Sequence, residues 1–227
     1  MIGEPSEPFY YPDQEMMDAL QEHDVPYGDD WDNAATVVAW AEAADRKRPW
    51  RSQFRDHIAA RVGMLALHAR VLELGSGPGF LAQRVLQRCP HLESYTLLDF
   101  SESMLAMSQE RLAAFATASF VLASFKSEDW TSRAVGQFDC VLSMQAVHEL
   151  RNKRHAPRLY GQIYQVLTVP GSIMICDHTP FDDSRSSTAL YMTEQEQRGA
   201  LLESRFTNVR IELSINGLLL YTGERTA

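Results

Sequence analysis

Hydrophobic and polar positions follow two periods along the chain, and their alternation predicts strands separated by helices. Short apolar runs, each long enough for one buried strand, are separated by stretches with apolar residues at helical spacing. The runs occupy residues 71–74, 95–99, 119–123, 138–143 and 172–176. Helices are expected to begin near Phe80 and after Ser101, and another is expected over residues 158–167. This order predicts an α/β fold with a mostly parallel sheet and helices on both faces.

The C-terminal part of the pattern predicts a helix followed by a hairpin. Thr193 and Glu196 have the spacing of a capping box at a helix start. The dipeptide Asn216-Gly217 is typical of a type I′ turn between antiparallel strands. The flanking strand segments are residues 208–215 and 218–222. Pro170-Gly171 predicts a turn before the fifth strand.

The N-terminal part of the chain has an amphipathic pattern and many aromatic residues. A helix is expected over residues 32–45, with Val37, Val38, Trp40 and Ala41 facing inward. The aromatic residues are Tyr10, Tyr11, Tyr27, Trp31, Trp40 and Trp50. We expect residues 1–50 to form a helical cap or lid over a domain of residues 51–227. The alternative is a helix that only packs on the core, with the terminal tyrosines against a neighbouring subunit.

Glycines follow the first strand at a spacing that predicts a nucleoside-binding turn. The run VLELGSGPG places Gly75, Gly77 and Gly79 where the backbone can turn sharply and approach a ligand. Dinucleotide binders need G-x-G-x-x-G, but Phe80 stands at the position of the third glycine. Asp99 ends the second strand about 20 residues further on, where a carboxylate can accept hydrogen bonds from a ribose diol.

Together, VLELGSGPG and LDFSESML resemble motifs I and II of class I S-adenosylmethionine-dependent methyltransferases, of the small-molecule type. The resemblance extends over residues 50–225. It implies a Rossmann-like seven-stranded sheet with an antiparallel C-terminal hairpin, S-adenosylmethionine as methyl donor and S-adenosylhomocysteine as product. The residues that it assigns to the cofactor are Glu73, Gly75, Ser76, Gly77, Gly79, Asp99, Phe100, Met104, Ser124, Phe125, Met144 and Gln145.

One of these positions departs from the family pattern. Ser124 stands where many relatives have an aspartate that accepts from the adenine amino group. A serine hydroxyl can still accept one hydrogen bond. Phe125 or Trp130 is a candidate for packing on the adenine face, and either is equally expected as a core residue.

The segment MQAVHEL follows the fourth strand, where methyltransferases place the sulfonium of the cofactor. His148 and Glu149 are therefore the candidate catalytic residues, and His148 is suited to take a proton from the acceptor. The alternative is structural, with His148 hydrogen-bonded locally and Glu149 paired to Arg151 or Arg154. The candidate substrate residues are Tyr10, Tyr11, Trp31, His148 and His178.

A metal site is a weaker alternative near the fifth strand. Asp177, His178, Asp182 and Asp183 have the chemistry to hold a divalent ion with a catechol-like substrate. Aspartates in a serine-rich loop are more often solvated turn formers, so we expect no metal.

Composition limits the partners and the compartment. The net charge of −9 over 227 residues disfavours nucleic acid or an anionic membrane as a partner. The cluster Arg46-Lys47-Arg48 with Arg51 is expected to be a solvated helix end. Cys89, Cys140 and Cys176 lack paired spacing, and no signal peptide or membrane-spanning run is visible, which predicts a cytoplasmic protein.

The sequence therefore predicts an enzyme that transfers a methyl group from S-adenosylmethionine to a small molecule by SN2 displacement. Two alternatives stay open: a non-catalytic S-adenosylmethionine-binding partner protein, and a protein or tRNA methyltransferase. A homodimer is left open as well.

Overall fold

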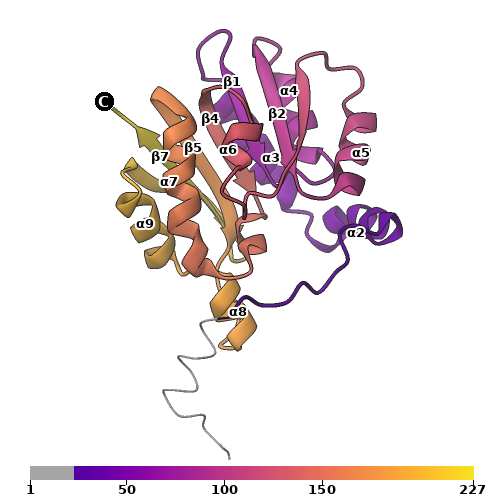
Figure 1. Ribbon diagram of the computed structural model, residues 1–227, viewed down its shortest axis with the longest axis vertical. Helices are drawn as coiled ribbons and strands as arrows, with labels where there is room; N and C mark the ends of the chain where they lie inside the picture. The colour runs from indigo at the N-terminus through magenta and orange to yellow at the C-terminus, as the bar shows by residue number, and fades with distance from the viewer. Residues whose placement is uncertain (1–22) are drawn as a thin grey trace, which may run out of the picture.

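The computed structural model describes residues 23–227, which fold around one seven-stranded sheet (Figure 1). The strand order is β3-β2-β1-β4-β5-β7-β6. The first five strands pair in parallel, whereas β7 runs antiparallel to β5 and β6 antiparallel to β7. The strands are β1 (Arg70–Leu74), β2 (Ser94–Asp99), β3 (Ala118–Leu122), β4 (Phe138–Met144), β5 (Leu167–His178), β6 (Thr207–Ile215) and β7 (Leu218–Arg225). The expected mixed sheet with an antiparallel C-terminal hairpin is confirmed.

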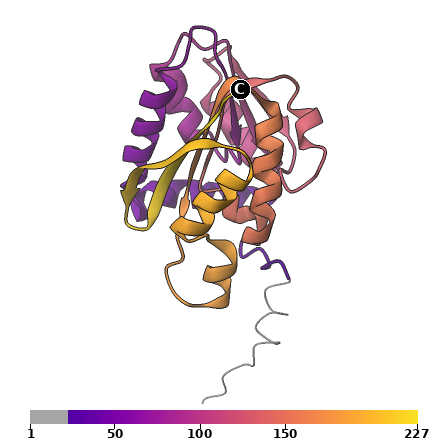
Figure 2. The same ribbon diagram turned by 90° about the vertical axis from the view of Figure 1, so that its left-hand side faces the viewer.

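Helices cover both faces of the sheet, as the alternating pattern predicts (Figures 1 and 2). One face packs against α3 and α4, and the other against α6, α7 and α9. Because strand side chains alternate between faces, Val71 belongs to the first of these cores and Leu72 to the second. The helices are α2 (Ala34–Lys47), α3 (Arg51–Val62), α4 (Phe80–Arg88), α5 (Glu102–Arg111), α6 (Trp130–Arg133), α7 (Ala156–Val166), α8 (Arg185–Leu190) and α9 (Glu194–Glu203).

The predicted helix caps are present. Ser101 caps α5 by accepting from the N–H of Met104 at 3.1 Å. Thr193 and Glu196 form the capping box of α9. Asn216 and Gly217 have φ of 51° and 73°, the left-handed values that a type I′ hairpin requires.

Several expectations about local structure are wrong. Pro170 and Gly171 lie inside β5, not in a turn before it, at the place where the pairing with β4 shifts register. The third strand begins and ends one residue earlier than expected, and α7 begins at Ala156. In α2, Val37 and Ala41 are buried, but Val38 is 43% exposed because it lies on the outer side of the helix.

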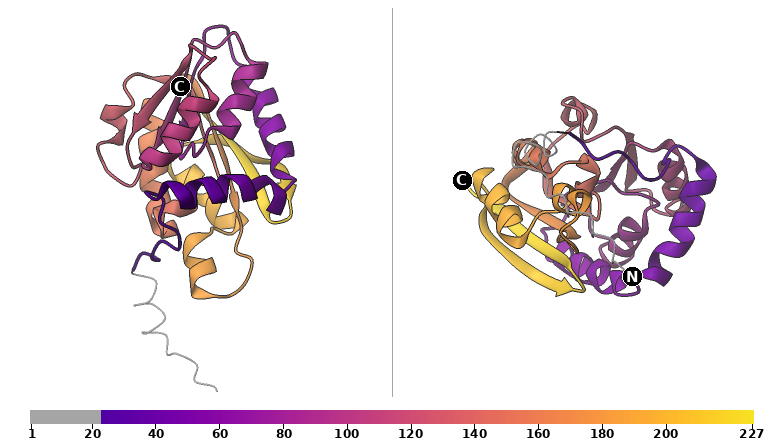
Figure 3. Two further views of the ribbon diagram at one scale, coloured as in Figure 1. Left: turned by 90° about the vertical axis from the view of Figure 1, so that its right-hand side faces the viewer. Right: turned by 90° about the horizontal axis from the view of Figure 1, so that it is seen from below.

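The chain path opens a site at the carboxyl end of the parallel strands. From β1 the chain continues outward to β2 and β3, whereas from β4 it continues in the opposite direction to β5. The connections that follow β1 and β4 therefore diverge, which leaves room between them. Helix α2, coloured indigo in Figure 3, runs across the molecule at this end. Two short 3₁₀ helices, η1 (Val147–Leu150) and η2 (Lys153–His155), follow β4.

All three cysteines are buried and unpaired, as expected for small core residues. Within residues 23–227, no helix is both long enough and apolar enough to cross a membrane.

Candidate active site

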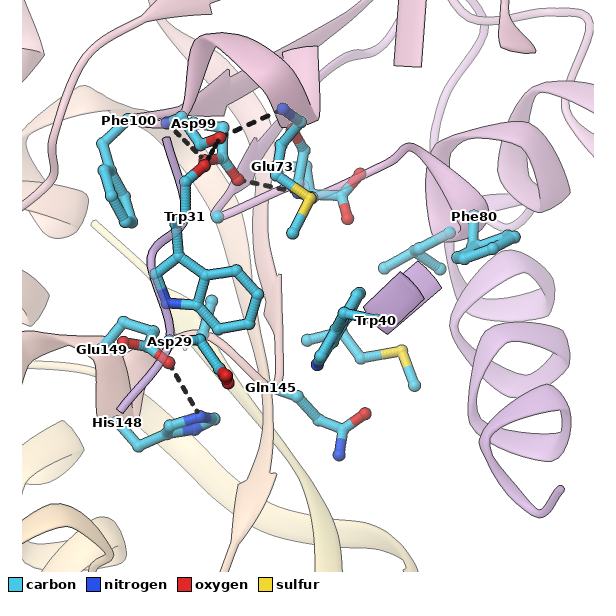
Figure 4. Close-up of a pocket in the computed structure, with 18 of the residues that line it drawn as sticks. Asp29, Trp31, Trp40, Glu73, Phe80, Asp99, Phe100, Gln145, His148 and Glu149 are labelled. Carbon is cyan, nitrogen blue, oxygen red and sulfur yellow. Dashed lines mark hydrogen bonds and ion pairs between the residues drawn. The ribbon is translucent and has the colours of Figure 1, made fainter. Parts of the chain in front are cut away.

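A cavity of about 360 Å³ lies at the carboxyl ends of β1, β2 and β4 (Figure 4). Of the residues that the resemblance assigns to the cofactor, all but Gly79 and Ser124 line it. Its walls are Gly28, Asp29, Trp31, Trp40, Arg48, Arg51, Arg55, Glu73, Gly75, Ser76, Gly77, Phe80, Leu81, Asp99, Phe100, Ser101, Met104, Phe125, Met144, Gln145, Ala146, His148, Glu149, Arg151 and Tyr191.

Each of the three loop positions requires glycine for a different structural reason. All three have positive φ, at 66° for Gly75, 54° for Gly77 and 78° for Gly79. A Cβ on Gly75 would lie 2.3 Å from the Cβ of Ala146, whereas one on Gly77 would meet no protein atom within 4 Å. A Cβ on Gly79 would lie 2.9 Å from the Cβ of Ser108. Gly79 therefore permits α4 to pack on α5, and Gly77 lines free space.

Asp99 braces the glycine loop from the end of β2. Its Oδ2 accepts from the N–H of Gly77 at 2.8 Å, and its Oδ1 accepts from the N–H of Ser101 at 2.9 Å. Burial raises the pKa of Asp99, while the N–H groups of Ser101, Gly77 and Phe100 oppose that shift. Each carboxylate oxygen has two lone pairs, so both oxygens can still accept a bond from a ligand hydroxyl.

Glu73 is buried beside the same loop. The hydroxyl of Tyr95 donates to its Oε2 at 2.8 Å, and burial raises the pKa of Glu73 to about 8. The carboxyl group is therefore mostly protonated at neutral pH in the free protein.

His148 is held at both its ring and its backbone by Asp177, the penultimate residue of β5. The imidazole Nδ1 lies 2.8 Å from Oδ1 of Asp177, and the backbone N–H of His148 donates to Oδ2 at 3.0 Å. Burial disfavours the imidazolium, but the charge and hydrogen bond of Asp177, assisted by Glu149, outweigh it and raise the pKa of His148. Nε2 is left on the cavity side, 3.5 Å from Oε1 of Glu149 (Figure 4).

Glu149 also pairs with Arg151, whose Nη1 donates to its Oε2 at 3.3 Å. The pairing of Glu149 with Arg151 and the local bond of His148 match the structural alternative. The same contacts leave His148 at the cavity wall with one nitrogen available, which the catalytic hypothesis requires.

A second polar group joins the ends of β4 and β5. Gln145 has φ of 58° and its N–H donates to the carbonyl of Cys176 at 2.6 Å. His178 lies behind the cavity wall, with its Nε2 2.6 Å from Nε2 of Gln145 and 3.1 Å from Nη1 of Arg48. Burial lowers the pKa of His178 to about 4, so its ring is neutral at physiological pH.

The expectation of a solvated cluster at the end of α2 is wrong for Arg51, whereas Arg46, Lys47 and Arg48 are exposed. Arg48 and Arg51 both line the cavity, and Arg51 is only 8% exposed. Its guanidinium lies over the ring of Trp40, 5.3 Å from the centroid. Basic residues near a helix end are typical of a solvated segment in sequence, and only the path of α2 across the strand ends accounts for the burial of Arg51.

Residues 23–33, here called the strap, pass over the cavity before α2. Arg151 donates to the carbonyl groups of Val25 at 3.0 Å and Pro26 at 2.6 Å. At the other end, Ser101 Oγ donates to the carbonyl of Trp31 at 2.5 Å. Trp31 thereby reaches the cavity, and its ring meets that of Trp40 edge-on with the centroids 5.7 Å apart. Tyr10 and Tyr11 lie outside the described residues.

The other predicted residues lie away from the cavity. Ser124 Oγ accepts from the N–H of Lys126 at 3.3 Å and does not line the cavity. Trp130 is fully buried in the core, so of the two candidates for the adenine face only Phe125 lines the cavity. Asp182 and Asp183 are exposed, and residues 23–227 hold no cluster of His, Cys, Asp and Glu suited to a metal ion.

The strand order and the glycine-walled cavity define a class I methyltransferase architecture. Residues 71–171 match the family model described as "Methyltransferase domain". Over these residues the chain is therefore similar to a methyltransferase domain, and its seven-stranded sheet has the fold of class I S-adenosylmethionine-dependent methyltransferases.

Solved structures share this fold at low sequence identity. An O-methyltransferase family protein from Burkholderia thailandensis is 16% identical with a TM-score of 0.62, over 84% of this chain and 62% of that one. The N-methyltransferase NodS from Bradyrhizobium japonicum is 14% identical with a TM-score of 0.63, over 79% and 98%. Human N-acetylserotonin methyltransferase, in complex with SAM, is 13% identical with a TM-score of 0.64, over 96% and 61%.

The chain thus spans less than two thirds of the Burkholderia and human proteins. No curated protein matches the chain.

Proposed function

We propose that this methyltransferase transfers the methyl group of S-adenosylmethionine to a small-molecule acceptor, with His148 as the general base. The observation that carries the proposal is the Asp177–His148 pair at the wall of the glycine-lined cavity. S-adenosylmethionine supplies an already activated methyl group when bound, so the protein must chiefly align the acceptor and take up its proton.

The cavity wall fits the cofactor chemically. Gly77 leaves space where any Cβ would intrude, and the hydroxyl of Ser76 is buried without a partner among the described residues. Asp99 can still accept hydrogen bonds from ribose hydroxyls. The adenine ring would find apolar surface on Phe100, Met104 and Phe125. The proposed cofactor residues are therefore those predicted from sequence, without Gly79 and Ser124.

His148 has the arrangement of an oriented base. In the neutral ring, the Nδ1–H donates to Asp177, so Nε2 carries a lone pair at the cavity wall, 3.5 Å from Oε1 of Glu149. A hydroxyl or amine acceptor would lose its proton to Nε2 as its lone pair bonds the methyl carbon, and the electron pair of the broken methyl–sulfur bond would leave with S-adenosylhomocysteine. Asp177 then stabilises the imidazolium until the proton passes to solvent.

The cap of the cavity supports a small acceptor. The strap and α2 contribute Trp31 and Trp40 to the walls, which narrows the cavity and favours an acceptor of small size. The acidic net charge of −9 disfavours a nucleic-acid substrate. We propose that the strap and α2 act as the lid of the domain.

Calorimetry with the native chain tests the cofactor half of the proposal. We expect S-adenosylhomocysteine to bind, NADH not to bind, and Asp99→Ala to bind about tenfold more weakly or worse through loss of a charge-assisted contact. Incubation with cell-extract metabolites and methyl-labelled S-adenosylmethionine then identifies the acceptor by mass. Absence of S-adenosylhomocysteine binding would overturn the proposal.

A further inference from the structure

Arg51 is a buried guanidinium without an anionic partner. It is 8% exposed and lines the cavity, yet its Nε has no hydrogen-bond partner in the part of the chain that the structure describes. No carboxylate among residues 23–227 forms an ion pair with it. Burial lowers its pKa to about 10, so it remains a cation at neutral pH.

Two of the other arginines at the same wall are neutralised by carboxylates. Arg55 pairs with Asp45 at 2.6 Å, and Arg151 pairs with Glu149 at 3.3 Å. Burying an unpaired charge is costly, and buried charges in proteins are normally paired. The contrast indicates that the partner of Arg51 is a ligand, since no carboxylate of residues 23–227 pairs with it.

The surroundings of Arg51 place it on the β5 side of the cavity. Burial chiefly lowers the pKa of His178, the residue that directly follows Asp177, and the charge of Arg51 adds to that shift. Arg48 lies on the same side and donates to Nε2 of the neutral His178 at 3.1 Å. Asp99 and Phe100, the expected nucleoside contacts, end the separate strand β2, and Figure 4 shows them apart from Gln145 and His148.

Aromatic rings border this part of the cavity. The guanidinium carbon Cζ of Arg51 lies over the ring of Trp40, 5.3 Å from its centroid, and the ring of Trp31 meets that of Trp40 edge-on. Tyr191 lies on the other side of the imidazole of His148, with ring centroids 5.2 Å apart. A cation beside aromatic walls is suited to a ligand that combines a carboxylate with a flat apolar body.

We propose that Arg51, assisted by Arg48, binds the carboxylate of an anionic methyl acceptor that has a flat apolar body. This substrate class rests on the function proposed above. The carboxylate anchors the acceptor, and its hydroxyl or amine faces His148.

S-adenosylmethionine also carries a carboxylate, so the carboxylate that pairs with Arg51 could belong to the acceptor or to the cofactor. The test must therefore separate an acceptor carboxylate from that of the cofactor. Saturating the native chain with S-adenosylhomocysteine fills the cofactor's own carboxylate position before any acid is added.

The experiment is calorimetric titration of this complex with benzoate, phenylacetate and indole-3-acetate, each compared with its neutral amide. We expect at least one acid to bind tenfold or more tightly than its amide. Arg51→Gln and Arg48→Gln should remove that preference while S-adenosylhomocysteine affinity stays within about twofold. Arg46→Gln, an exposed residue on α2 that does not line the cavity, is the matched control and should keep the preference.

Two results overturn the proposal. One is that no acid is preferred over its amide in the native complex. The other is that Arg51→Gln weakens S-adenosylhomocysteine itself tenfold or more, which assigns the guanidinium to the cofactor. If the native chain does not bind S-adenosylhomocysteine, the proposed function fails first, and this result is distinct from both.

Discussion

The imidazole Nδ1 of His148 and the carboxylate of Asp177 lie 2.8 Å apart, and the same carboxylate also accepts the backbone N–H of the histidine at 3.0 Å. One side chain of β5 thus fixes both the ring and the turn after β4. The pair is stable in a limited pH range. The stability that the ionised Asp177 contributes is lost as pH falls through the lowered pKa of that carboxyl. The stability that the protonated His148 contributes is lost as pH rises through the raised pKa of the ring.

Asp177→Asn should move the pH profile of methyl transfer. A base acts in its neutral form, so the native rate should rise with pH through a pKa above the ordinary histidine value of 6.5. Without the carboxylate charge, burial dominates and the pKa of His148 falls, so the rising limb of kcat should move to lower pH. Rates from pH 5 to 9 measure this shift.

His148→Gln is the companion variant and should lower the plateau rate by about 10²- to 10⁴-fold. If neither variant changes the profile, His148 holds the loop and is not the base.

Gly75→Ala and Gly77→Ala should separate folding from ligand binding. The Cβ at Gly75 would clash with Ala146, so this variant should lose about 2 to 5 kcal/mol of unfolding free energy. The Cβ at Gly77 meets open space, so only backbone strain remains and the loss should be about 1 kcal/mol. Urea denaturation measures both losses.

Binding should follow the opposite order for these two glycines. Because a methyl group on Gly77 occupies cavity space, Gly77→Ala should weaken S-adenosylhomocysteine more than its small stability loss suggests. If a folded Gly77→Ala variant binds S-adenosylhomocysteine with unchanged affinity, the proposed contact between the glycine loop and the cofactor is contradicted.

Ser101→Ala should affect both a helix cap and the strap. The hydroxyl accepts from Met104 and donates to the carbonyl of Trp31, whereas Thr193 at the start of α9 only caps its helix. Both alanine variants should lose about 1 kcal/mol of stability. Only Ser101→Ala should also weaken S-adenosylhomocysteine, by about three- to tenfold, because it frees one end of the strap. Equal affinity in the two variants would show that this contact does not hold the lid.

Glu73→Gln should change how stability depends on pH. Burial raises the pKa of Glu73 from 4.5 to about 8, so between these values the folded chain binds more protons than the unfolded chain. Native stability therefore falls with rising pH through this window, by at most about 1.4 kcal/mol per pH unit from this group. The glutamine keeps the contact with Tyr95 and cannot ionise. The free energy of unfolding of the variant should therefore increase relative to that of the native chain from pH 5 to 8. Denaturant titrations at several pH values without ligand measure it, and parallel curves would contradict the raised pKa.

Local patterns were sufficient to predict the sheet and most of the cofactor wall. Apolar runs mark buried strands wherever the sheet is covered on both faces, and Gly75, Gly77 and Asp99 follow such runs directly. Gly79 shows the limit of the motif, because its glycine serves contact with Ser108, a neighbour that spacing alone does not reveal. Pro170 was read as a turn former, but it lies in a strand whose pairing has a local irregularity.

The acceptor side of the cavity depends on long-range contacts. Arg51 follows a helix and a proline, a pattern that is typical of a solvated helix end. Its burial results from α2 crossing the carboxyl ends of the strands. Asp177 was considered only as a metal ligand, because nothing local connects it to His148, 29 residues earlier. Side chains that meet through strand order require the topology before they can be paired.

The divergence of the chain after β1 and β4 has a consequence for how this protein can change. The cavity exists because two connections leave a sheet in opposite directions, so no individual wall residue creates it. Its lining comes from segments that are separate in sequence, and each can be substituted without rebuilding the others. The place where a ligand sits is thus inherited with the topology, while the identity of that ligand is open to revision one side chain at a time.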